Sequence, residues 1–317
     1  MDILFVIDNI EFKYFEFNNL VTNFWIIKEL LSKRNKVFIT TKNRLFLQGK
    51  TAFAEVFESY IKEEDICYKK NSEDTKLDDF DLIIFRPDPP VDNDYINATY
   101  ILDFTDTKII NNHRAIRDFN EKLHSVIFNE YMPENITTSS KTKIEEFLKE
   151  HGEIILKPLN RCFGSGVMYL HQGDPNTRSI INAMTNNENS VIMVQEYIPA
   201  VKYGDKRVLT LGETVMDECV IKLPTSDDFK FNTHSDDYIK KGVLTEQERT
   251  DFTNVAKKLN ELGIYMAGLD VVDGKIIEIN VTSPCYFIKE INNSFNTHIE
   301  HQICDYIMSL SNLIKIT

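Results

Sequence analysis

The residues best suited to chemistry lie near the C-terminal end, in two apolar stretches joined by the turn Asp273-Gly274. Glu278 and Asn280 are two positions apart, so in a strand their side chains face the same side. Asp270 lies on the stretch before the turn. Two carboxylates and an amide oxygen are hard ligands, which suit a magnesium ion that also binds water and phosphate. The alternative is an edge hairpin whose polar face only contacts water.

The length of the turn decides whether these side chains converge. A two-residue loop would pair Asp270 with Ile277 and place the two carboxylates on opposite faces, whereas a loop with an odd number of residues would place them together. We therefore predict a three-residue loop, Val272-Asp273-Gly274, with Gly274 left-handed in a β-bulge.

Composition narrows the classes of function. The 317 residues are 42% hydrophobic and 11% aromatic, which is enough for two or three domains with buried cores. A net charge of −13 argues against nucleic-acid binding. The five cysteines include no C-x-x-C pair, which fits a reducing cytosol. The opening apolar run is too short for a signal peptide, and no run approaches the roughly 20 residues of a membrane span. We expect a soluble cytoplasmic protein that acts on small molecules, without nucleic acid or membrane.

The first 120 residues or so alternate between strand and helix patterns, which predicts a parallel sheet with helices on both sides. Ligands bind beyond the carboxyl ends of such strands, so Arg86 and Asp88, after the strand Leu82–Phe85, are candidate site residues. The alternative is a rigid proline turn with a surface ion pair. No G-x-G-x-x-G follows the first strand, which argues against a dinucleotide oxidoreductase.

A second unit, from about 125 to 200, carries a glycine loop between two strands. Gly164 and Gly166 would let backbone N–H groups approach phosphate oxygens, although this loop taken by itself is better explained as a plain turn. Arg207, at the start of a later strand, is well placed to bind a carboxylate in bidentate fashion. The polar stretch 224–242 is long for a connection, which is typical of a lid or of a disordered segment. Lys122 lies beside the apolar face of a predicted helix, where lysine is usually solvated.

Six short segments resemble the ATP-grasp ligases and, more narrowly, the bacterial glutathione synthetases, over nearly the whole chain. They are 86–90 with 98–102, 117–123, 155–159, 204–209, 268–270 and 278–284. The resemblance implies an α/β protein with an ATP-grasp fold, in which two α+β subdomains clasp ATP, preceded by an N-terminal Rossmann-like domain with a parallel sheet. The implied boundaries are 1–122 for the N-terminal domain, 123–200 for the central lid subdomain and 201–317 for the C-terminal subdomain with the magnesium site.

The resemblance also implies a reaction. ATP phosphorylates the free carboxylate of γ-glutamylcysteine, and the amine of glycine then attacks the acyl phosphate to give glutathione, ADP and phosphate. Magnesium, or manganese in its place, would be the metal. Relatives assemble as homo-oligomers, usually tetramers, and this chain is expected to do the same.

The roles implied by the resemblance fall into four groups. Residues implied in catalysis are Lys122, Lys157, Arg207 and Lys222. Residues implied in ATP binding are Lys122, Lys157, Gly164, Gly166, Gln195, Glu196, Tyr197, Ile198, Asp205 and Asn280. Residues implied in substrate binding are Arg86, Asp88, Arg207, Ser283 and Lys289. The implied metal ligands are Asp270, Glu278 and Asn280.

The chain departs from the family pattern in three places. Relatives carry a glycine-rich loop with an arginine where this chain has 227–238, which contains no glycine. Lys222 and Lys289 stand where arginines are expected, so bidentate contacts become point-charge contacts. Arg161-Cys162-Phe163 replaces smaller glycines in the phosphate loop. These departures leave two other hypotheses open: a sister ligase with another acceptor, and a nucleotide-binding protein without catalysis.

Overall fold

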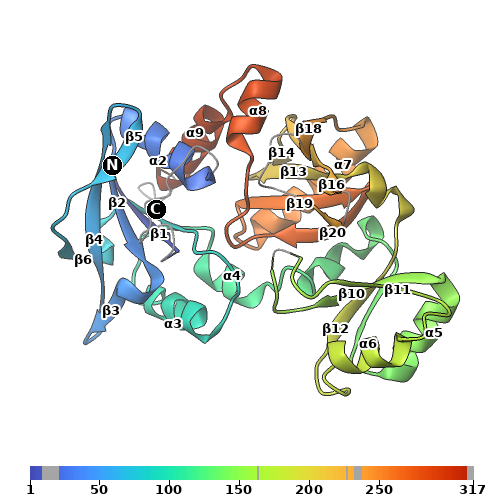
Figure 1. Cartoon of the computed structure of the whole chain (residues 1–317). Coiled ribbons are helices and arrows are strands. Elements are labelled where there is room, and N and C mark those ends of the chain that lie inside the picture. The colour runs from blue at the N-terminus through green and yellow to red at the C-terminus, as the bar shows by residue number, and fades with distance from the viewer. Residues whose placement is uncertain (9–20, 163, 226–227, 232–237, 313–317) are drawn as a thin grey trace.

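Three large β-sheets follow one another along the chain, with helices packed on their faces, and the described residues also contain a small two-stranded sheet (Figure 1). The computed structural model describes residues 1–8, 21–162, 164–225, 228–231 and 238–312. Figure 1 shows the first sheet on the left, the second at lower right and the third at upper right. Within the described residues, no helix is long and apolar enough to cross a membrane.

The first sheet is built around four parallel strands, as predicted. Their bounds are β1 (Asp2–Ile7), β2 (Lys36–Thr41), β7 (Leu82–Phe85) and β8 (Ile109–Ile110). The sheet continues past β2 into antiparallel strands that the sequence did not predict, in the order β3-β4-β2-β1-β7-β8, with β5 and β6 paired to β4. These are β3 (Leu45–Gln48), β4 (Thr51–Lys62), β5 (Asp65–Tyr68) and β6 (Glu73–Lys76).

Helices cover both faces of this sheet because successive side chains of its buried strands point in opposite directions. On one face, Ile3, Phe5 and Ile7 share a core with α2 (Thr22–Ser32) and the C-terminal helix α9 (Ile299–Asn312). On the other face, Leu4 and Val6 share a core with α3 (Asn93–Leu102). Short helical segments complete this region: η1 (Lys42–Arg44), η2 (Leu77–Asp79) and α4 (His113–Asp118).

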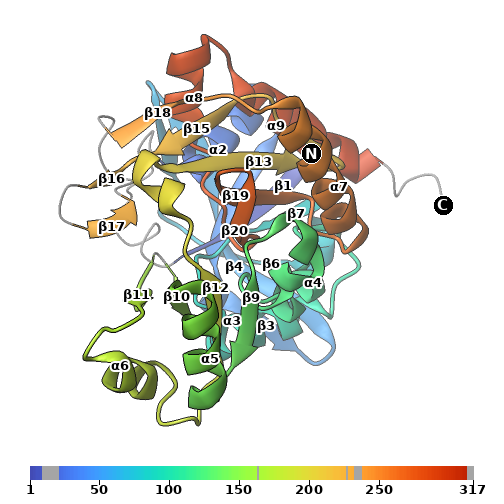
Figure 2. The ribbon, with the colours of Figure 1, turned by 90° about the vertical axis from the view of Figure 1, so that its right-hand side faces the viewer.

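The second sheet is antiparallel, in the order β11-β10-β12-β9, and has its own core. Its strands are β9 (Asn135–Thr138), β10 (Glu153–Pro158), β11 (Met168–His171) and β12 (Ile192–Glu196). The helices α5 (Lys141–His151) and α6 (Thr177–Met184) pack against it, and η3 (His124–Tyr131) precedes it. In Figures 1 and 2 this sheet lies below the third sheet, next to β20, and Lys157 Nζ of β10 donates a hydrogen bond to Ile277 O of β20 (2.8 Å).

The third sheet runs in the order β18-β15-β13-β19-β20, with β14 (Thr214–Val215) paired to β13. Its main strands are β13 (Asp205–Leu211), β15 (Cys219–Lys222), β18 (Ile239–Gly242), β19 (Met266–Val272) and β20 (Lys275–Asn280). One face packs on α7 (Glu246–Glu261), which begins with a capping box between Thr245 and Glu248. The segment η4 (Pro199–Tyr203) precedes the sheet, and α8 (Ile288–Phe295) follows it.

The stretch expected to form a lid contains strands. Two of them, β16 (Pro224–Thr225) and β17 (Asp228–Phe231), pair with each other, and β18 joins the third sheet. Residues 226–227 and 232–237 lie outside the described residues, and so does Phe163 of the glycine loop. The glycine-poor segment 227–238 therefore falls largely outside the description.

The hairpin β19–β20 corrects the predicted loop. Val272 pairs with Lys275, so the loop has two residues, Asp273 and Gly274, with φ of 49° and 74°. The prediction of a left-handed Gly274 is confirmed, but the three-residue loop is wrong. The extra residue is Ile277 in β20, because Val271 pairs with Ile276 while Asp270 pairs with Glu278. A bulge inside the strand thus places both carboxylates on one face, which the loop was expected to do.

Candidate active site

Four charged side chains lie buried on one face of the third sheet. Asp205 pairs in register with Lys222, and Arg207 with Asp270, so the two-residue period brings all four together. Arg207 binds both oxygens of Asp270, through Nε to Oδ1 (2.7 Å) and Nη2 to Oδ2 (3.1 Å). Lys222 Nζ lies 2.8 Å from Asp205 Oδ2 and 2.9 Å from Asp270 Oδ1. The bidentate geometry expected of Arg207 is present, and its partner here is a carboxylate of the protein itself.

The pKa values of the two carboxylates in this cluster are shifted in opposite directions. Burial alone would raise the pKa of Asp270, but Arg207 and Lys222 hold it well below its usual range. Burial raises the pKa of Asp205 to about 6, against the opposing charge of Lys222. The buried Oδ1 of Asp205 has no hydrogen-bond partner in the part of the chain that the structure describes. An unmatched buried acceptor is costly, so this oxygen is a candidate contact for a ligand.

The predicted metal ligands converge on this cluster from β19 and β20. Asn280 Nδ2 donates to Asp270 Oδ2 (3.0 Å) and Gly268 O (3.3 Å). Glu278 pairs in register with Asp270 and accepts a hydrogen bond at Oε1 from Lys122 Nζ (2.9 Å). The donor set consists of oxygens alone, with neither thiolate nor imidazole. Its chemistry fits magnesium, and manganese as a substitute.

Two lysines from outside the sheet reach the same place. Lys122, expected to be solvated if it had no role, is only 5% exposed and also donates to Arg161 O in the glycine loop (2.8 Å). Lys157 projects from β10, and burial lowers its pKa to about 8. Both ammonium groups therefore lie at the junction of the second and third sheets. Gly164 and Gly166 adopt left-handed conformations in the loop beside them, with φ of 66° and 73°.

Gln195 on β12 is the candidate contact for a nucleotide base at one edge of the site. Its side chain is 1% exposed, and Nε2 has no hydrogen-bond partner within the described ranges. The N–H groups of Glu196 and Tyr197 donate to Glu134 O (2.9 Å) and Glu153 O (3.1 Å). Because those two groups are engaged within the subdomain, Gln195 Nε2 is the better candidate than they are for donating to a ligand. Ile198 follows them, just before η4.

The candidate substrate residues connect the first sheet to the segment after β20. Arg86 is 4% exposed and donates to Asn23 Oδ1 (2.7 Å) and Pro284 O (2.8 Å), so the alternative that places this side chain at the surface is wrong. Asp88 instead accepts a hydrogen bond from Ser283 Oγ, and burial raises its pKa. Lys289 lies on α8, half-buried, further along the chain.

Two residues that position the site were not predicted. Glu121 Oε1 accepts from Val281 N (2.7 Å), Thr282 N (3.1 Å) and Thr282 Oγ1 (3.1 Å). Asn111 donates from Nδ2 to Met266 O (2.7 Å) and Val281 O (2.9 Å). Both fix the hairpin from more than 150 positions away. A residue's own neighbours in sequence carry no signal for such contacts.

Comparison with known families gives this site its context. The model of the prokaryotic glutathione synthetase N-terminal domain matches residues 1–117, and that of the prokaryotic glutathione synthetase ATP-grasp domain matches residues 121–296. The chain belongs to the prokaryotic glutathione synthetase family. The glutathione synthetase of Vibrio vulnificus (strain YJ016) is 36% identical over 270 residues, covering 84% of this chain and 85% of that protein. The glutathione synthetase of Neisseria meningitidis serogroup B is 33% identical over 300 residues, covering 90% and 92%.

Solved structures confirm the predicted fold of this family member. The D-cycloserine synthetase DcsG has a TM-score of 0.64 at 12% identity, covering 98% of this chain and 99% of that chain. D-alanyl-alanine synthetase A from Vibrio cholerae has a TM-score of 0.62 at 12% identity, covering 98% of both chains. At such identities the likeness concerns the fold alone. The predicted ATP-grasp architecture, and the resemblance on which it rested, are confirmed.

Proposed function

We propose that this chain is an ATP-dependent ligase that joins γ-glutamylcysteine to glycine, giving glutathione, ADP and phosphate. The observation that carries the proposal is the convergence of Asp270, Glu278 and Asn280 with the buried Lys122 and Lys157, in a chain of the glutathione synthetase family. A carboxylate is a poor electrophile, and phosphorylation makes it open to attack by an amine. Such a transfer needs positive charge around the phosphoryl oxygens.

Asp270, Glu278 and Asn280 would hold magnesium, or manganese in its place. When bound, the metal neutralises charge on the phosphate oxygens of ATP. In the structure these carboxylates are held by Arg207, Lys222 and Lys122. The protein's own cations thus balance the acidic ligands, so that neither carboxylate is left as an uncompensated charge.

Lys122 and Lys157 are proposed to bind the transferring phosphate. Their ammonium groups lie in a buried place, where a charge interacts more strongly than in water. Gly164 and Gly166 would let backbone N–H groups approach the same oxygens. In their present contacts, both lysines donate to backbone carbonyls, Arg161 O and Ile277 O, which orient the two side chains.

The adenine would lie against Gln195 and the segment Glu196–Ile198, with Asp205 nearby. Adenine offers both a donor, at N6, and ring-nitrogen acceptors. The unmatched Gln195 Nε2 and Asp205 Oδ1 are one donor and one acceptor, which support this assignment. Their pairing with a ligand would remove two buried unsatisfied atoms.

Arg207 and Lys222 are proposed to act on the dipeptide substrate, with Ser283 and Lys289 contacting its carboxylates. Metal binding at Asp270 competes with these two cations for the same oxygens. We infer that their charge then becomes available to the substrate. Arg86 and Asp88 are proposed to line this substrate site, because their contacts with Pro284 and Ser283 position the segment after β20.

We further propose that residues 1–122, 123–200 and 201–317 are the N-terminal domain, the central subdomain and the C-terminal subdomain. The proposal draws on the sheets, whose strands fall in these three ranges within the described part of the chain.

The enzyme is proposed to act in the cytoplasm, as a homo-oligomer and most simply a tetramer. Light scattering on the purified protein tests the assembly.

The decisive experiment measures ADP release from Mg-ATP with γ-glutamylcysteine and glycine, omitting each in turn, with glutathione identified by mass. Release that needs both substrates and forms glutathione supports the proposal. Release with the dipeptide that does not depend on glycine points to a sister ligase with another amine. That second candidate is favoured by Lys222, a point charge where the family has arginine. ATP binding without any release would indicate a non-catalytic protein.

A further inference from the structure

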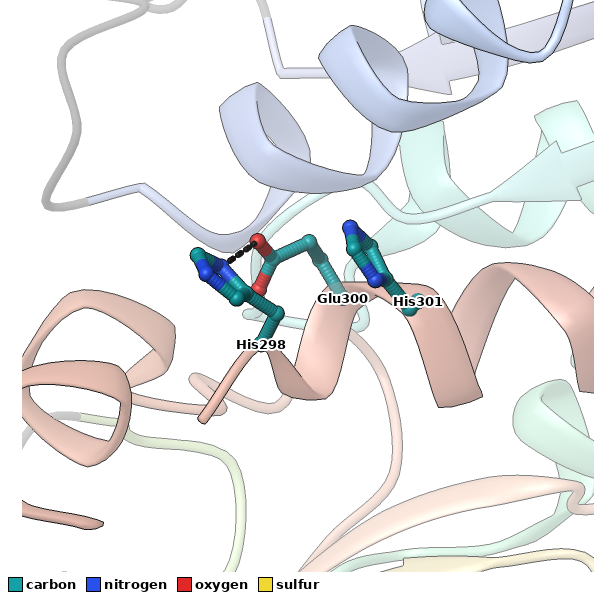
Figure 3. Close-up of side chains that lie close together, drawn as sticks. All are labelled: His298, Glu300 and His301. Carbon is teal, nitrogen blue, oxygen red and sulfur yellow. Dashed lines mark hydrogen bonds and ion pairs between the residues drawn. The ribbon is translucent and has the colours of Figure 1, made fainter. Parts of the chain in front are cut away.

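A second cluster of potential metal ligands lies at the start of α9, away from the candidate active site (Figure 3). His298 comes just before the helix, and Glu300 and His301 lie in its first turn. One ligand atom from each residue lies within 4.8 Å of the others. Figure 3 shows the carboxylate of Glu300 between the two imidazole rings.

One of the separations in this cluster already suits a small tetrahedral ion. Two ligands about 2.0–2.1 Å from a tetrahedral zinc ion lie roughly 3.3–3.4 Å apart. His298 Nδ1 is 3.1 Å from Glu300 Oε1, close to that separation. The His298 and His301 side chains are 69% and 55% exposed, so both rings have room to adjust. Two imidazoles and one carboxylate, with the fourth position left to water, form a donor set that zinc often uses.

The carboxylate of this cluster is held in place by buried partners. Glu300 is 5% exposed, and its Oε2 accepts a hydrogen bond from Asn292 Nδ2 on α8 (2.7 Å). Asn292 Oδ1 in turn accepts from Ile299 N (3.0 Å). Oε1 is thereby directed toward His298. Outer hydrogen bonds of this kind fix the orientation of metal ligands.

A residue from the N-terminal part of the chain completes the surroundings. Glu29 on α2 lies with Oε2 3.5 Å from His301 Nε2. A carboxylate next to a ligating imidazole orients the ring and raises its basicity. The cluster therefore joins α2, α8 and α9, which belong to distant parts of the sequence. The simpler explanation is two ion pairs made by exposed imidazole rings, which would contribute little to stability.

We propose that His298, Glu300 and His301 form a site for a transition-metal ion of the zinc class, separate from the ATP site. Imidazole nitrogen favours zinc over magnesium, so the two sites differ in the metal that they select. The ion fixes the first turn of α9 against α8 and, through Glu29, against α2. Its role is structural, and it takes no part in ligation.

The test titrates metal-free protein with Zn²⁺ in the presence of excess Mg²⁺, in competition with a chromogenic chelator. One equivalent of Zn²⁺ should bind tightly and raise the melting temperature. The double variant His298→Ala/His301→Ala should weaken binding by about 100-fold or more, and should lose the thermal gain. His171→Ala, at an exposed histidine of β11, is the matched control and should keep both.

Two further measurements separate this site from the ATP site. Co²⁺ in place of Zn²⁺ should give the intense visible absorption of a tetrahedral ion, and Glu300→Gln should remove it. ADP release in Mg²⁺ alone should be unchanged in the double variant. Full Zn²⁺ binding by the double variant, or no stoichiometric binding by the parent protein, would overturn the proposal.

Discussion

At the residue scale, several groups of the site compete for the carboxylate oxygens of Asp270. It accepts hydrogen bonds from Arg207, Lys222 and Asn280, and against the effect of burial the charges of Arg207 and Lys222 hold its pKa well below the usual range. A carboxylate that stays ionised is suited to a metal ion. The same contacts mean that metal binding and substrate binding are coupled through one side chain, because each new partner of Asp270 displaces another.

Glu278→Gln tests the metal assignment, since the change removes a charge and little volume. We expect turnover to fall roughly 10²–10³-fold, because the variant would hold the metal less well and the charge on the phosphoryl oxygens would no longer be neutralised. The melting temperature should stay close to that of the parent. Steady-state ADP release and circular dichroism measure the two effects. Glu130→Gln, at an exposed glutamate of η3, is the control, and retained activity of the Glu278 variant would contradict the assignment.

Lys157→Met should stabilise the fold while abolishing turnover. Burial lowers the pKa of Lys157 from 10.5 to about 8, so folding disfavours its charged form at neutral pH. That difference corresponds to about 3 kcal/mol, of which roughly 1 kcal/mol is offset by the lost hydrogen bond to Ile277 O. Urea unfolding at pH 7 should therefore show a gain of about 1–2 kcal/mol. A loss of stability would mean that burying the charged Lys157 side chain does not cost the folded state free energy.

The same pKa gives a dependence on pH. Between about pH 8 and 10.5 the unfolded chain binds more protons at Lys157 than the folded chain does. Its contribution to the free energy of unfolding therefore rises with pH across this window. The Met variant should lose this rise. In the parent, the KM for ATP should increase above pH 8 as the ammonium loses its proton, and a KM that is flat through pH 9 would contradict the phosphate-binding role.

At the element scale, the hairpin shows what the sequence could and could not predict. The ligands Asp270, Glu278 and Asn280 were found from their types and spacing, and their convergence is confirmed. The predicted loop length was wrong because a bulge anywhere along a strand changes the face on which the following side chains lie. Here the bulge is at Ile277, beyond the turn. Likewise β3–β6 escaped prediction. The four-residue strands β5 and β6 resemble loops, whereas β4 has 12 residues with alternating buried side chains, a strand pattern that the sequence-based prediction did not use.

Gly204, between η4 and β13, has a conformation and surroundings that exclude a side chain. Its φ is 106°, and an added Cβ would lie 2.6 Å from Lys222 O. Gly204→Ala should lower the free energy of unfolding by about 2–4 kcal/mol, from backbone strain and overlap with β15. Gly173→Ala is the matched control, with φ of 89° and nothing within 4 Å, and should cost only about 1–2 kcal/mol. Equal effects in denaturant unfolding would show that the overlap relaxes freely.

At the scale of the whole molecule, the two ends of the chain share one core. Ile27 of α2 and Ile303 of α9 belong to the same buried cluster, with residues of the first and third sheets. The second sheet has a separate core, which contains Ile181. Contacts over such separations could not be predicted, because the pattern of an amphipathic helix identifies the face that is buried but does not identify the element against which that face packs. The burial of Lys122 and the partners of Asp270 were hidden for the same reason.

These two cores should respond differently to the same truncation. Ile303→Ala and Ile181→Ala each remove the same atoms at fully buried positions, and each should cost about 2–4 kcal/mol. Hydrogen exchange measured by mass should then speed up in both the N-terminal sheet and α8–α9 for Ile303→Ala, because one cluster links them. For Ile181→Ala the increase should be confined to about 135–196, the range of the second sheet. Faster exchange throughout the chain in both variants would mean that the molecule opens as one cooperative unit, and that the second sheet does not move independently around ATP.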